Sequence, residues 1–135
     1  MKDCRTELVT GLITAIDAQS TGLTVYTKVP KSVTYPYLYI TEIIDVEDGT
    51  KNQFMYGYDL SMELVYKDLT DKAAMWSAVD KIKGIINNKN PFSIGGNFYI
   101  MAMTLIDTTE AEDLLNSQEV DTTTIRVNFD IEDNN

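Results

Sequence analysis

Histidine is absent from this sequence of 135 residues and cysteine occurs once, as Cys4, so several kinds of chemistry are excluded. Without histidine there is no Ser/His/Asp or Cys/His nucleophile system, no imidazole-ligated zinc site and no imidazole acid or base. A lone cysteine forms no intrachain disulfide, which is typical of a reducing compartment. Because Cys4 lies between Lys2 and Arg5 near the start of the chain, we expect some thiol reactivity there but no catalysis.

Long apolar runs are also missing. No run approaches the roughly 18 apolar residues of a transmembrane helix, and the first residues lack the apolar stretch of a secretory signal. A content of 44% hydrophobic and 24% charged residues is typical of one globular domain. We therefore expect a soluble α+β domain over residues 1–135, with no membrane contact and a flexible acidic tail at about 132–135.

Sequence motifs for catalysis or cofactor binding are lacking too. Gly95-Gly96 is followed neither by Gly-Lys-Ser/Thr nor by a helix, so it predicts a turn rather than a phosphate loop. Acidic residues at 45–48 and 107–113 do not have the spacing of an EF-hand loop, although weak Ca²⁺ or Mg²⁺ binding remains an alternative. We predict a protein that is not an enzyme and that carries no metal and no cofactor.

Positive charge is scarce, because 11 Lys and Arg stand against 21 Asp and Glu, for a net charge of −10. Most of the excess lies in residues 107–135, where nine carboxylates face Arg126 alone. A negative domain repels phosphate backbones, so sequence-specific recognition of DNA or RNA is not expected. The simpler interpretation of the acidic run is a solvated surface.

Hydrophobic periodicity predicts two amphipathic helices, a short acidic third helix and six strands. The helices are expected at 6–19, capped by Asp3 or Thr6 and ended by Gly22, and at 71–87, capped by Asp68 or Thr70. Trp76 is expected to pack the second helix on the sheet. The acidic helix is expected at 108–118. The strands are expected at 23–27, 37–43, 54–66, 92–94, 97–106 and 122–131.

Two of these strands carry most of the information about the fold. Residues 54–66 place seven apolar side chains at alternate positions, which predicts a long strand with one buried face. Residues 98–106 are apolar on both faces, which indicates a central strand or one with a face for another subunit. Gly95-Gly96 would join 92–94 to 97–106 as a hairpin. The order of elements predicts an α+β fold, a mainly antiparallel or mixed sheet covered by two helices on one face.

Tyrosine is the abundant aromatic residue, with eight Tyr against four Phe and one Trp. Tyrosine is favoured where a surface is buried against another protein but keeps wet edges. Rings that border the core are an equal alternative, and both interpretations stay open. The candidate residues for contacts between subunits or with a partner are Tyr35, Tyr37, Tyr56, Tyr58, Tyr99, Met101 and Met103.

The order of elements, together with Val29-Pro30 and Tyr35-Pro36-Tyr37, resembles the phage tail terminator or tail completion family, which includes the minor tail protein U of lambda-like phages. Residues 6 to 131 take part in the resemblance. It implies a structural virion protein that forms a ring, usually of six copies, at the head-tail junction. Such a ring caps the tail tube, ends its elongation and provides the docking surface for the head. The partners implied are other copies of the chain, the tail tube protein and a head-tail connector protein, first in the host cytoplasm and then in the virion.

DNA would pass through such a ring without sequence-specific binding, and an acidic wall would not trap it. The candidate residues for this acidic lumen are Asp45, Glu47, Asp48, Glu110, Glu112 and Asp113. Two alternatives remain at this stage. One is another neck ring of the same virion, a stopper or adaptor, and the other is a small acidic cytosolic protein-binding module.

Overall fold

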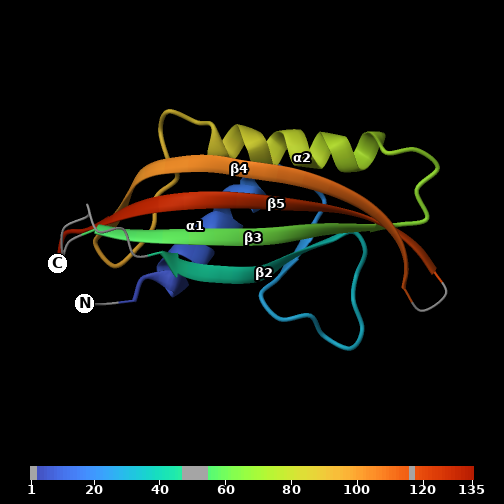
Figure 1. Ribbon diagram of the computed structural model, residues 1–135, viewed down its shortest axis with the longest axis horizontal. Helices are drawn as coiled ribbons and strands as arrows, with labels where there is room; N and C mark the ends of the chain where they lie inside the picture. Colours follow the sequence, from blue (N-terminus) through green and yellow to red (C-terminus); the bar gives the residue numbers. More distant parts are fainter. Residues whose placement is uncertain (1–2, 47–54, 116–117) are drawn as a thin grey trace.

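The structure is a computed structural model that describes residues 3–46, 55–115 and 118–135. Two helices and five strands follow each other along the chain in the order α1, β1, β2, β3, α2, β4, β5 (Figure 1). Their bounds are α1 Arg5–Ala18, β1 Thr24–Tyr26, β2 Tyr37–Val46, β3 Met55–Lys67, α2 Ala73–Ile86, β4 Phe98–Leu115 and β5 Gln118–Asp133. Within the described ranges, neither helix is both long enough and apolar enough to cross a membrane.

The five strands form one mixed sheet in the order β1-β2-β3-β5-β4. β1 pairs with β2 in parallel, and every other pair is antiparallel. β3 is 13 residues long and pairs on both sides, with β2 and with β5, so the strand with the clearest alternation is the centre of the sheet. The α+β prediction is confirmed.

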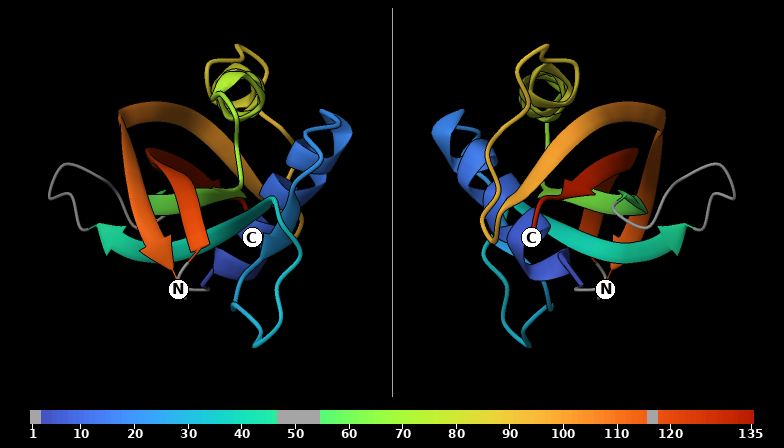
Figure 2. Two further views of the ribbon diagram at one scale, coloured as in Figure 1. Left: turned by 90° about the vertical axis from the view of Figure 1, so that its right-hand side faces the viewer. Right: turned by 90° about the vertical axis from the view of Figure 1, so that its left-hand side faces the viewer.

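Both helices cover the same face of the sheet, as the two end views show (Figure 2). Leu8, Leu12 and Ile16 of α1 have no exposed surface, because their spacing places them on one side of the helix. Met75 and Ile82 of α2 are buried in the same cluster. The even-numbered residues of β3 and the odd-numbered residues 123–131 of β5 complete this core from the sheet side.

The start of α1 differs from the prediction at Cys4. Asp3 accepts a hydrogen bond from the backbone N–H of Arg5, while Cys4 takes the N-cap position and is fully buried. Burial raises the pKa of the Cys4 thiol, and the nearby carboxylates of Asp3 and Glu7 act in the same direction, against the hydrogen bond with Tyr58. The expectation of a reactive thiol is wrong, because a buried thiol with a raised pKa is a weak nucleophile.

Several expectations for the second half of the chain are also wrong. Residues 108–115 continue β4 instead of forming an acidic helix, because they pair with β5 from Ile125 to Gln118. Residues 92–94 are not a strand, so Gly95-Gly96 is a turn but not a hairpin. α2 begins at Ala73 without a side-chain cap from Asp68 or Thr70. β4 is an edge strand, not a central one.

The end of the chain is more ordered than a solvated tail would be. Glu132 and Asp133 belong to β5 and pair with β4. The backbone N–H of Asn134 donates to the carbonyl of Asn97 at 3.1 Å, and the Asn135 side chain donates to the carbonyl of Gly96 at 2.8 Å. The last residues therefore tie the sheet to the turn before β4.

Candidate assembly surfaces

Neither α1 nor α2, the helices of the described residues, covers the other face of the sheet, and we call it the open face. It carries the odd-numbered residues of β3 and the even-numbered residues of β5, which are mostly polar or charged. Acidic side chains on this face include Glu42, Asp59, Glu63, Asp107, Asp130 and Glu132. Basic side chains on the described strands of this face are Lys67 and Arg126, and Arg126 pairs with Asp107 at 2.9 Å.

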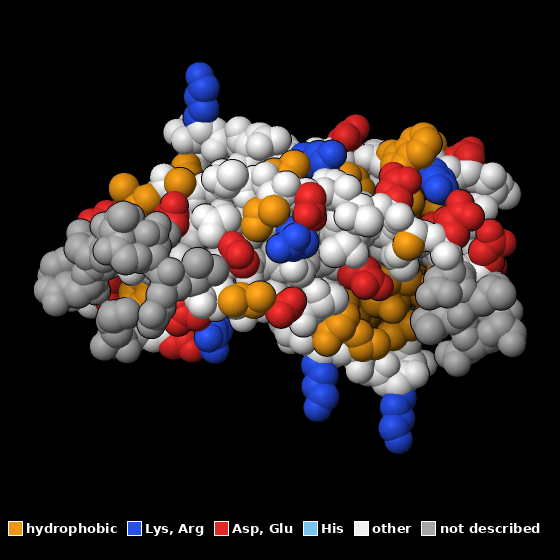
Figure 3. Space-filling view, viewed as in Figure 1, with side chains coloured by type: hydrophobic (Ala, Val, Ile, Leu, Met, Phe, Trp, Pro, Cys, Tyr) orange, Lys and Arg blue, Asp and Glu red, His pale blue; other side chains and the backbone are white. Residues whose placement is uncertain are grey.

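At one end of the open face an apolar area interrupts the polar surface, and we call it the tyrosine cup. Figure 3 shows a hollowed orange area beside the loop that joins β1 to β2. The cup consists of Tyr26, Val33, Tyr35, Tyr37, Tyr39, Val65 and Val120. It is a second hydrophobic cluster, separated from the main core by the thickness of the sheet.

The rings of the tyrosine cup hold one another in place. Tyr37 lies 5.6 Å from Tyr26 in an edge-on arrangement and 5.4 Å from Tyr35 in a tilted one, measured between ring centroids. The hydroxyl of Tyr26 accepts the backbone N–H of Thr34 at 3.1 Å, which fixes the loop 27–36 against the cup. Aromatic pairs of this geometry add stabilisation beyond the area that they bury. The cup is therefore preformed.

Charged side chains surround the tyrosine cup. The Lys67 ammonium lies 5.5 Å from the centre of the Tyr35 ring, within cation–π range. Lys28 and Lys31 are exposed in the loop 27–36. Burial raises the pKa of the Glu63 carboxyl, which faces Tyr39 across β2 and β3, and burial also raises the pKa of Tyr37. Lysine is thus the charged residue at the Tyr35 ring and in the loop 27–36, while Glu63 is a carboxylate beside Tyr39.

A second exposed patch lies at the opposite end of the open face, and we call it the acidic edge. It consists of Tyr99 and Met101 on β4 with Asp130 and Glu132 on β5. Tyr99 is 51% exposed and Met101 is 55% exposed. Met101 sits at a bulge between Ile100 and Ala102, and Ile106 sits at a second bulge. From Val120 to Glu132 the strand runs about 40 Å, so the two patches are far apart.

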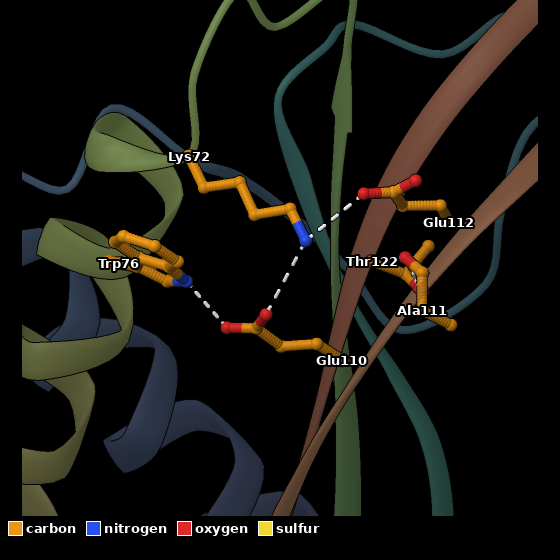
Figure 4. Close-up of polar contacts among 6 residues, drawn as sticks. All are labelled: Lys72, Trp76, Glu110, Ala111, Glu112 and Thr122. Carbon is orange, nitrogen blue, oxygen red and sulfur yellow. Dashed lines mark hydrogen bonds and ion pairs between the residues drawn. The ribbon is translucent and has the colours of Figure 1, made fainter.

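A polar cluster joins α2 to β4 on the helix-covered side, and we call it the latch (Figure 4). The Lys72 ammonium lies 3.7 Å from Glu110 and 3.1 Å from Glu112, and the Trp76 indole N–H donates to Glu110 at 2.5 Å. The hydrogen bond with Glu112 raises the pKa of Lys72. Trp76 is 51% exposed, so it links the helix to the sheet through its N–H and not by buried packing as expected.

The structure separates the predicted contact residues into three groups. Tyr56 and Tyr58 are buried in the main core and are occupied within the chain, while Met103 is partly buried and packs against that core. Tyr35 and Tyr37 belong to the tyrosine cup, and Tyr99 and Met101 belong to the acidic edge. Alternate residues of β3 point to the same face of the sheet, which explains why Tyr56 and Tyr58 are both buried in the core.

The predicted lumen carboxylates do not form one group either. Asp45 is exposed near the end of β2, while Glu47 and Asp48 lie outside the described residues. Glu110 and Glu112 belong to the latch, and only the backbone of Asp113 is described. In the register Asp45 aligns with Tyr58 and Glu110 with Leu64, so the two sets are about 20 Å apart along the sheet.

The described residues line two pockets of small volume. A shallow pocket of about 340 Å³ is lined by residues 91–94 and 97–100. A second of about 290 Å³ lies between α1 and residues 93–95, next to Glu7. In the described ranges no three acidic or cysteine side chains come close enough together to hold a metal ion.

Sequence reasoning missed part of the tyrosine cup and the whole latch. Tyr26, Tyr39, Val65 and Val120 come from four strands, and Lys67 follows the last apolar residue of β3. Val65 could have indicated the cup, because it is an apolar residue among the mostly polar odd-numbered residues of β3. Predicting the latch requires knowing that β4 extends to Leu115. The acidic composition of 108–118 predicted a helix there instead.

No family model matches the sequence, and no curated protein matches it. Among solved structures, the chain is similar to a chain of the structure described as "Virion of native gene transfer agent (GTA) particle", with a TM-score of 0.68 and 11% sequence identity. The match covers 98% of this chain and 99% of that chain. At this identity the likeness establishes a common fold.

Proposed function

We propose that this chain is a structural protein of a phage-like virion. The observation that carries the proposal is the fold likeness to a chain of a gene transfer agent virion, which extends over nearly the whole of both chains with a TM-score of 0.68. The likeness covers 98% of this chain and 99% of that chain, so it concerns nearly every element described above. The conspicuous surface features of the described residues are apolar and charged patches, and we propose that these serve assembly.

We further propose that the chain acts at the head-tail junction, as a ring that caps the tail tube, ends its elongation and receives the head. The order of elements and the Val29-Pro30 and Tyr35-Pro36-Tyr37 segments support this finer role through their resemblance to tail terminators. The open face gives physical support, because it presents two separate patches that no described element covers. A closed ring needs two different complementary surfaces on each copy.

For the channel of this ring we propose that the end of β2 with Asp45 faces the DNA. Glu110 and Glu112 are the weaker candidates, since Lys72 already lies within ion-pair distance of both carboxylates. A carboxylate whose charge is offset by a nearby lysine repels phosphate less, and repulsion is what keeps a moving genome from adhering to the wall. An electron-microscopy map of the assembled ring with residue 45 on its outer rim would contradict this assignment.

The proposed role is tested by the native mass of the purified chain over a wide concentration range, together with electron micrographs of the heaviest species. We expect a ring of about six copies with a central hole, as implied by the resemblance. A compact dimer without a hole would instead favour the small binding module. A chain that forms no ring at any concentration would count against the ring.

The location is tested with antibodies against this chain on particles made from the genome that encodes it. We expect label at the head-tail junction and nowhere else. Label along the tail tube or on the head would leave a structural role in the virion but overturn the terminator role. Label on a neck storey nearer the head would favour a stopper or adaptor ring.

A further inference from the structure

We propose that the tyrosine cup of one copy receives the acidic edge of the next copy, so that Tyr99 and Met101 of one chain enter the cup of its neighbour. This inference rests on the proposed ring and identifies the two surfaces that join its subunits. The occupant of the cup is thus a second copy of this chain.

The apolar parts of the two patches suit each other chemically. The cup presents several tyrosine rings over a floor of Tyr37, Val65 and Val120, each of which has less than a tenth of its surface exposed. A methionine makes favourable contacts with aromatic rings and adapts to irregular hollows. Met101 and Tyr99 are half exposed, and so have apolar surface to bury. Aromatic and methionine side chains are enriched at protein interfaces.

The charges around the two patches have opposite signs. Lys67 lies over the Tyr35 ring of the cup, and Lys28 and Lys31 are exposed in the loop 27–36 that contributes Val33 and Tyr35 to it. The carboxylate beside the cup is Glu63, which pairs with Tyr39. Asp130 and Glu132 flank Tyr99 and Met101 in the register of β4 and β5. Bringing the two patches together places cations beside carboxylates around an apolar centre, which is the usual anatomy of a specific interface. Two copies joined cup to cup would instead bring the lysines together.

The placement of the patches allows a contact between two different surfaces of neighbouring copies. They lie on the same face, about 40 Å apart along β5, and they differ from each other. A contact between two different patches is heterologous, and repeated copies close into a ring when the rotation between them fits. Each copy then uses its cup once and its acidic edge once.

The test uses variants that each remove one patch. We expect Met101→Asp and Tyr35→Asp each to weaken self-association by about 30-fold or more, as for central interface residues. The matched control is Ile106→Asp, since Ile106 is 42% exposed at the other bulge of β4 and lies outside both patches. It should assemble like the wild type. Circular dichroism and urea unfolding of each variant confirm that it is folded, and Lys67→Glu replaces Tyr35→Asp if that variant unfolds.

Mixing the two variants gives the sharper result. Met101→Asp keeps an intact cup and Tyr35→Asp keeps an intact acidic edge, so the mixture can form one good contact and then stop. We expect a heterodimer from the mixture, while each variant alone stays monomeric. In a second series, Lys67→Glu and Glu132→Lys each weaken assembly, and the chain with both changes recovers it.

The outcomes separate this pairing from the proposed function. If the wild type forms rings and both single-patch variants also form them, the pairing is wrong and the ring stands. If the variants lose assembly but their mixture gives no heterodimer, the two patches do not meet each other and the pairing is again wrong. If the wild type itself forms no ring, the proposed function fails first.

Discussion

The two faces of the sheet are completed in different ways. The helix-covered face is buried within the chain, because α1 and α2 cover the even-numbered residues of β3 completely or nearly so. The open face is mostly polar, with the tyrosine cup at one end and the exposed Tyr99 and Met101 of the acidic edge at the other. The first face explains why the chain folds, and the second is the face on which assembly depends in our proposal.

The largest expected difference between the faces is in core packing. Phe129 has no exposed surface and packs edge-on against Phe92 at 6.3 Å between ring centroids. Phe129→Ala should lower the free energy of unfolding by about 3–5 kcal/mol, because it leaves a cavity. Thr104→Ala, at an exposed position of β4 on the open face, should change it by less than about 0.5 kcal/mol. Urea denaturation measures the free energy of unfolding of both variants. Equal losses would contradict the proposed difference between the two faces.

A smaller effect distinguishes two positions in the helical cover. A methyl group at Gly11 of α1 would lie 2.6 Å from Ile94 Cγ2 and 2.8 Å from the Ser93 carbonyl oxygen, whereas one at Gly84 of α2 would meet nothing within 4 Å. Gly11→Ala should therefore destabilise the protein by about 1–3 kcal/mol through overpacking. Gly84→Ala should stabilise it by about 0.5–1 kcal/mol through helix propensity. Thermal unfolding that showed the same sign for both would contradict the close approach at Gly11.

The smallest effect concerns the open face and depends on pH. Burial raises the pKa of Glu63, so the folded state holds its proton more tightly than the unfolded state. Stability is then lost as pH rises from the unfolded pKa through the raised folded pKa. Glu63→Gln should raise the melting temperature at neutral pH and make no difference near about pH 4. Glu42→Gln, at an exposed position on the same face, serves as the control, and an equal gain there would contradict the role of burial.

The helix-covered face was largely predictable from the sequence, and the open face was not. Alternation in 54–66 predicts β3, and the three- and four-residue spacing of Leu8, Leu12 and Ile16 predicts α1, because each pattern is local. The continuation of β4 through 108–115 was missed, since pairing with β5 overrides the helix-favouring Leu114, Leu115 and carboxylates. The tyrosine cup was missed as a unit because four strands and a loop contribute to it.

The two bulges of β4 affect how its outer edge can pair with other strands. No described strand pairs with this edge, and β4 is 18 residues long, so a flat version would be a template for fibril growth. The irregularities at Met101 and Ile106 interrupt its hydrogen-bonding register twice within ten residues. Copies of the chain are thereby hindered from stacking strand upon strand without limit, so the long edge is protected against aggregation.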